Sequence, residues 1–91
     1  MPQALADFTA AHALAERAQS PEALGITAFG LARAYAANGQ STDALHHTQA
    51  ALGHLHSIGH IYAQAVTDFA RLIEHGSPPT DALAFTTAYG F

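Results

Sequence analysis

Residues 31–52 read LARAYAANGQSTDALHHTQAAL, and this stretch decides the fold. Two runs with the apolar spacing of helices meet in it at residues 38–41. Gly39 can adopt the positive φ that ends a helix, and Ser41 or Thr42 can cap the helix that follows. The stretch therefore predicts a helical hairpin, from which the other elements can be placed.

Two helices are predicted before the corner at Gly39. Pro2 and the apolar spacing after it indicate a helix over residues 2–18. Ser20 is placed to cap a second helix and Pro21 to open it, and this helix runs to Asn38.

The pattern after the third helix leaves two architectures open. Residues 56–59 can form a tight turn, with Ser57 capping a fourth helix that ends at His75–Gly76. Alternatively, the apolar residues keep a spacing of three and four without a break, which indicates one long helix over residues 42–75. The second architecture is a four-helix bundle that dimerises through its long helix.

The last part of the chain predicts one more short helix. Pro78 and Pro79 stop the preceding helix, and Thr80–Asp81 start a segment that carries apolar residues to the C-terminus. The predicted fold is therefore all-α, a single domain over residues 1–91 with four to five antiparallel helices.

Composition favours association with another protein. Hydrophobic residues make up 49% of the 91 residues and charged residues only 11%, against a usual charged fraction of about a quarter. A chain this short buries a thin core, and alanine fills little of it. A weakly charged surface then favours self-association or a stable partner.

The charges argue against several classes of function. The chain has net charge −4, with three arginines, no lysine and no basic patch that could neutralise phosphates, so no nucleic-acid partner is expected. It has no cysteine, no apolar run of about 18 residues and no basic region after Met1 that would indicate a signal peptide. We therefore expect a cytoplasmic protein that does not bind membranes.

A nine-residue motif recurs in the chain. Thr-Asp-Ala-Leu-x-x-Thr-x-Ala begins at Thr42 and again at Thr80, an offset of 38 residues. A period of this size is typical of stacked helical hairpins. Chance repetition in alanine-rich helices is the competing explanation.

The same residues resemble the tetratricopeptide repeat family, which pairs two helices in about 34 residues. One repeat matches at about residues 25–58, and a second, from about Gly59, is degenerate. The matched positions are Leu31, Ala32, Tyr35, Gly39, Ala44, Ala51 and Leu52, then Tyr62, Ala65, Val66 and Phe69. Ala28, Thr48 and the lack of a proline near His56 depart from the family pattern. The resemblance implies an adaptor that holds a peptide or protein segment on a concave face.

Seven histidines are the unusual count in this composition. His56 and His60 have the spacing with which two imidazoles on one helix face share a metal, and a turn near Ser57 would bring His54 beside them. The simpler interpretation is that these are solvent-facing polar positions. A metal, haem or small-ligand sensor site at His54, His56 and His60 is thus the alternative function, and the main hypothesis needs no cofactor.

The main hypothesis is a non-enzymatic interaction module. The serines sit at predicted helix starts, where capping explains them, and no glycine-rich phosphate loop is present. Most aromatic residues have core spacing, but Phe29 lies off the main stripe of its helix. The candidate contact residues are Phe29, Arg33, Tyr62, Tyr89 and Phe91. We expect an adaptor that binds a protein segment, or a second copy of itself, through an alanine- and aromatic-lined helical face.

Overall fold

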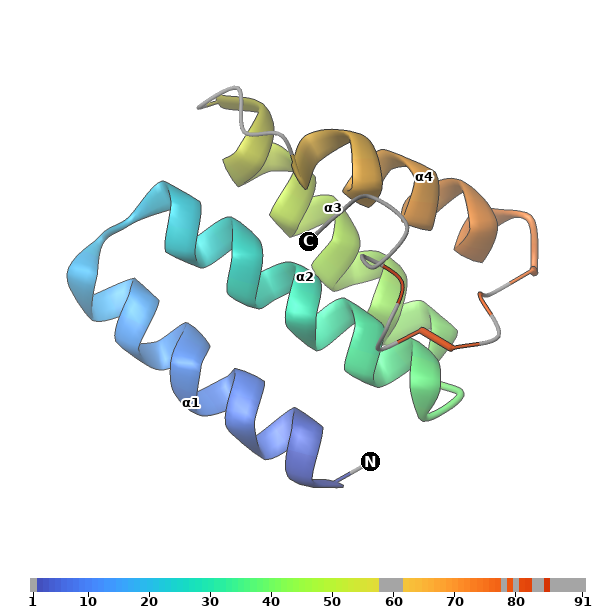
Figure 1. Ribbon diagram of the computed structural model, residues 1–91, viewed down its shortest axis with the longest axis horizontal. Coiled ribbons are helices and arrows are strands. Elements are labelled where there is room, and N and C mark those ends of the chain that lie inside the picture. The colour runs from blue at the N-terminus through green and yellow to red at the C-terminus, as the bar shows by residue number, and fades with distance from the viewer. Residues whose placement is uncertain (1, 58–61, 78, 80, 83–84, 86–91) are drawn as a thin grey trace.

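The computed structural model describes residues 2–57, 62–77, 79, 81–82 and 85, apart from the side chains of Pro2, Ser57 and Tyr62. These residues form four α-helices and no strand, which confirms the predicted all-α fold. The helices are α1 (Pro2–Ala18), α2 (Pro21–Ala37), α3 (Ser41–Ser57) and α4 (Tyr62–Glu74). Each helix packs against the next and runs antiparallel to it (Figure 1).

Local signals fix the boundary between α1 and α2. The Ser20 hydroxyl oxygen accepts a hydrogen bond from the backbone N–H of Ala23 (3.2 Å), and Pro21 occupies the first helical position, as predicted. Gln19 ends α1 with φ 52°, although it is not a glycine. Its N–H and that of Ser20 bond back to carbonyls in the last turn of α1 (3.2 and 3.4 Å), which is the Schellman pattern.

Gly39 closes α2 with φ 78°, as the sequence predicts. Its N–H and that of Gln40 donate to carbonyls in the last turn of α2 (3.1 and 2.9 Å). Helix α3 then begins at Ser41, so neither Ser41 nor Thr42 caps it and that prediction is wrong. Gln40 precedes the helix instead, and its side-chain amide donates to the Asp43 carboxylate (3.3 Å).

Helices α3 and α4 pack against each other, so one continuous helix over residues 42–75 is excluded. A straight helix cannot lie alongside itself, and the unbroken apolar spacing was misleading on this point. Ser57 belongs to α3 and does not cap α4 as predicted. Residues 58–61, which separate α3 from α4 in the sequence, lie outside the described residues.

The end of α4 confirms the predicted stop at His75–Gly76. Gly76 has φ 70°, and its N–H and that of Ser77 donate to carbonyls in the last turn of α4 (3.1 and 2.9 Å). Most of the predicted last helix lies outside the described residues. The described members of that segment, Asp81, Ala82 and Phe85, are not α-helical.

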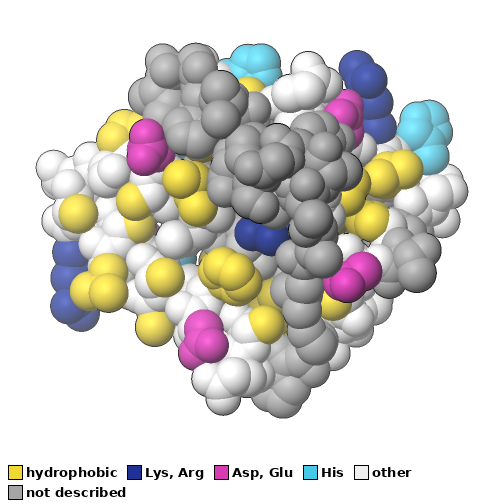
Figure 2. Space-filling model, viewed as in Figure 1, with side chains coloured by type: hydrophobic (Ala, Val, Ile, Leu, Met, Phe, Trp, Pro, Cys, Tyr) yellow, Lys and Arg dark blue, Asp and Glu magenta, His cyan; other side chains and the backbone are white. Residues whose placement is uncertain are grey.

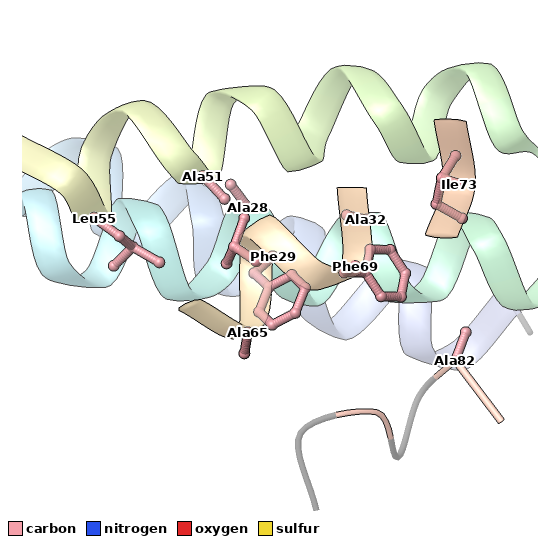
Figure 3. Packing of buried hydrophobic residues seen from close by; sticks show 10 residues of the cluster. Ala28, Phe29, Ala32, Ala51, Leu55, Ala65, Phe69, Ile73 and Ala82 are labelled. Atoms are coloured by element: carbon pink, nitrogen blue, oxygen red, sulfur yellow. The ribbon is translucent and has the colours of Figure 1, made fainter. Parts of the chain in front are cut away.

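The core is built from alanines and a few large side chains, which lets the helices lie close together (Figure 3). Phe29, Leu55, Val66 and Phe69 are its largest fully buried apolar side chains. The cluster is Ala28, Phe29, Ala32, Ala51, Leu55, Ala65, Val66, Phe69, Ile73 and Ala82. The buried Thr48 donates its hydroxyl to the Ala44 carbonyl (2.6 Å), so it adds no unpaired hydroxyl to the core.

Two glycines of α2 allow its neighbours to approach closely. A Cβ at Gly25 would lie 2.5 Å from side-chain carbons of the fully buried Leu55 in α3. A Cβ at Gly30 would overlap the ring of Phe8 in α1. The packing of α1 and α3 on α2 therefore depends on the missing side chains at these positions.

Candidate interaction surfaces

An aromatic cluster joins α2, α4 and the segment after α4. The rings of Phe29 and Phe69 meet edge-on, with centroids 5.4 Å apart. Phe85 meets both rings edge-on, at 6.5 Å from Phe29 and 5.1 Å from Phe69. These are favourable geometries for aromatic pairs. Figure 3 shows the Phe29 and Phe69 rings close together, with Ala82 coming from the segment after α4.

We call Phe29, Ala32, Ala65 and Phe69 the α2–α4 face. Each of these side chains is 0% exposed. Ala82 is 4% exposed and belongs to the buried cluster, and the half-buried Phe85 packs against that cluster. Both residues come from the segment after α4 and lie outside the four helices. A short segment of the chain thus occupies a helical surface that already contains two aromatic rings.

Phe29, which was predicted as a contact residue, is not accessible in the chain as described. Its ring is in the core, because the side of α2 that lies off the main stripe is covered by α4 and Phe85. The Arg33 guanidinium stacks on this ring (4.9 Å from its Cζ to the centroid) and on the Phe8 ring (5.8 Å). Arg33 therefore links α1 to α2 in the chain as described.

The remaining candidate contact residues are Tyr62, Tyr89 and Phe91. Tyr62 opens α4, but its side chain is not among those described. Tyr89 and Phe91 lie outside the described residues. Their role in binding remains a prediction.

The histidines proposed for a metal are only partly described. His54 is half-buried near Gly25, His56 is exposed, and His60 lies outside the described residues. Within the described part of the chain, no three histidine, aspartate or glutamate side chains are placed to hold a metal ion.

Two other histidines, His12 of α1 and His47 of α3, each contact a residue of α2. The Thr27 hydroxyl donates to the Ala23 carbonyl (2.7 Å), and its oxygen is also within hydrogen-bond distance of Nδ1 of His12 (2.7 Å). The His47 ring stacks on Tyr35, with centroids 5.1 Å apart and planes 5° from parallel. These contacts join each of the neighbouring helices α1 and α3 to α2, and the i, i+4 spacing of His56 and His60 gives no sign of them.

The pKa of His47 is lowered from its ordinary value of 6.5. Burial is the largest cause, because it disfavours the charged ring, and His46 and His12 add like charge; Asp43 acts in the opposite direction. The His46 ring lies edge-on to that of His47, with centroids 5.3 Å apart. Protonation at this site therefore opposes the packing of α3 on its neighbours.

A second apolar surface lies on the outer side of α1, which packs on α2 with its inner side. We call the exposed residues Ala6, Ala10, Ala13 and Leu14 the α1 outer face. Leu14 is 62% exposed, and no other large hydrophobic side chain of the described residues is exposed. Figure 2 shows hydrophobic side chains scattered over the region where Figure 1 places α1, with a basic and an acidic side chain among them. The sequence carries this signal, because Leu14 falls outside the stripe of Leu5, Phe8 and Ala15.

The described part of the chain encloses no pocket. No described helix is both long and apolar enough to cross a bilayer. Comparisons with models of known protein families, with curated proteins and with solved structures found no match. The α2–α4 face and the α1 outer face are therefore the candidate sites for binding a partner.

Proposed function

We propose that this chain is a non-enzymatic protein-interaction module whose α2–α4 face binds an apolar protein segment with an aromatic anchor. The observation that carries the proposal is the packing of Phe85 against Phe29 and Phe69, with Ala82 of the same segment buried in the same cluster. This contact is made by a segment outside the four helices, so it is a contact of the kind that a ligand would make.

The chemistry of the face specifies the ligand. Phe85 presents its ring to the edges and faces of two rings, and each aromatic pair of this kind contributes about 0.5–1.5 kcal/mol beyond area burial. Ala82 is 4% exposed and belongs to the same buried cluster. A ligand therefore needs a small residue and an aromatic residue about three positions apart, as Ala82 and Phe85 are.

In the intact chain, the C-terminal segment competes with any external ligand. A segment tethered by a short linker acts at an effective concentration in the millimolar range, so a free peptide with equal contacts binds poorly at micromolar concentration. Removing the Phe85 ring removes the main anchor of the tethered competitor. The full chain with Phe85→Ala is therefore the form in which the face can be tested.

The test uses a fluorescent peptide of residues 77–91, SPPTDALAFTTAYGF, and fluorescence anisotropy. We expect saturable binding to the Phe85→Ala chain and at least about tenfold weaker binding to the unchanged chain. The matched control is the same peptide with Phe85→Ala, which should bind neither form. Far-UV circular dichroism must show that the variant chain keeps its helices.

Two results would count against the proposal. One is the absence of binding to a folded Phe85→Ala chain. The other is equal binding of the native peptide and its Phe85→Ala version, because the aromatic anchor would then contribute nothing.

A further inference from the structure

The α1 outer face has properties that the α2–α4 face lacks: it is exposed, it has no covering segment among the described residues, and it lies on an end helix. Ala6, Ala10 and Ala13 recur every three or four positions, so they form one stripe along α1. Leu14 projects beside that stripe and is 62% exposed. The surface thus combines a stripe of small residues with one large apolar side chain.

Three charged residues of α1 are exposed, Asp7, Glu16 and Arg17, and the positions of Asp7 and Arg17 favour one kind of partner. Asp7 lies in the N-terminal half of α1, where its carboxylate accepts a hydrogen bond from the Gln3 amide (2.8 Å). Arg17 lies in the last turn and is exposed. Two parallel copies of α1 would place like charges together. Two antiparallel copies place Asp7 of each beside Arg17 of the other, and they also oppose the helix dipoles favourably.

We propose that the α1 outer face binds a second copy of this chain, with the two α1 helices antiparallel. When the helices cross near residue 12, Leu14 of each copy lies over Ala10 of the other, and the alanine stripe allows a close approach. The contact is isologous, so it closes at a dimer. This inference concerns a different surface from the proposed segment-binding face and does not depend on it.

The length of α1 limits the area that the dimer can bury. A helix of 17 residues is about 25 Å long, and one face of it buries less than the roughly 800 Å² per partner of a standard interface. An interface below standard size is typical of weak complexes, so we expect the dimer to form only at high protein concentration.

The experiment is sedimentation velocity on the full chain from about 10 µM to about 1 mM, a range that brackets a weak interface. The unchanged chain should move from 9.5 kDa toward twice that mass as concentration rises. Leu14→Glu should stay monomeric throughout. Gln49→Glu adds the same charge at an exposed position of α3 and should dimerise like the unchanged chain.

A charge exchange tests the orientation. Asp7→Arg and Arg17→Asp should each dimerise less well than the unchanged chain, because each places like charges across an antiparallel pair. An equimolar mixture should recover the dimer as a heterodimer, although both variants keep a net negative charge. A monomeric mass at about 1 mM, a dimer unaffected by Leu14→Glu, or a mixture without recovery would each overturn the proposal. None of these outcomes bears on peptide binding at the α2–α4 face.

Discussion

The same Gly→Ala change should have opposite effects at two helical glycines. Gly53 is exposed in α3, and a Cβ there meets nothing within 4 Å. Gly53→Ala should therefore give the full gain in helix propensity, about 1 kcal/mol of stability. For a domain of this size, that gain raises Tm by about 4–8 °C.

Gly25→Ala has the same gain in propensity but creates an overlap. The new Cβ would lie 2.5 Å from Leu55, whose side chain is 0% exposed and has no free space to enter. Overpacking of a core costs about 1–3 kcal/mol, and the rigid surroundings place this site in the upper part of that range. The net effect should be a loss of about 1–2 kcal/mol, so Tm should fall by at least about 4 °C. Gly30→Ala should cost less, because Phe8 is only half-buried and can move.

The assay is thermal and urea unfolding followed by far-UV circular dichroism for the three variants and the unchanged chain. The decisive expectation is that Tm rises in Gly53→Ala and falls in Gly25→Ala. If both variants were stabilised by the same amount, α2 and α3 would not approach each other as closely as described, and the account of the hairpin would be refuted.

Three further predictions concern single residues. Gln19→Gly should stabilise the chain by about 0.5–1 kcal/mol, because a non-glycine residue at φ 52° is strained; an unchanged urea midpoint would argue against that backbone conformation. Ser20→Ala should cost about 1 kcal/mol through loss of the cap, measured in the same way; a cost within error of zero would show that the hydroxyl does not cap α2. The lowered pKa of His47 means that the unfolded chain takes up a proton more readily below about pH 6.5, so stability present above that pH is lost as the pH falls. Tm should therefore drop between about pH 7.5 and about pH 5.5. The drop should be smaller in His47→Gln than in the control His56→Gln, because His56 is exposed. Equal drops in the two variants would contradict the burial of His47.

The helix ends that were predicted correctly depend on signals within a few residues. Ser20, Pro21, Gly39 and Gly76 act on the backbone next to them, so their effect can be deduced without knowing the tertiary structure. The prediction failed at Ser57, where a polar residue that could cap a helix lies inside α3. Apolar spacing also failed there, because it continues in phase across a chain reversal.

The candidate contact residues were harder to predict, because burial is decided by distant parts of the chain. Phe29 looked peripheral on its own helix, but Phe69 and Phe85 cover it from 40 and 56 residues away in sequence. The stacking of Arg33 on Phe8 and Phe29 depends in the same way on how α1 crosses α2. A pattern within one helix identifies its inner stripe but not how many of its sides are covered.

The most direct test of the proposed function is to map the peptide of residues 77–91 on the ¹⁵N-labelled Phe85→Ala chain by NMR titration. The account predicts shift changes concentrated on the backbone amides of the α2–α4 face, at Phe29, Ala32, Ala65 and Phe69, with α1 unaffected. A titration that leaves those amides unchanged, or that perturbs only α1, would contradict it.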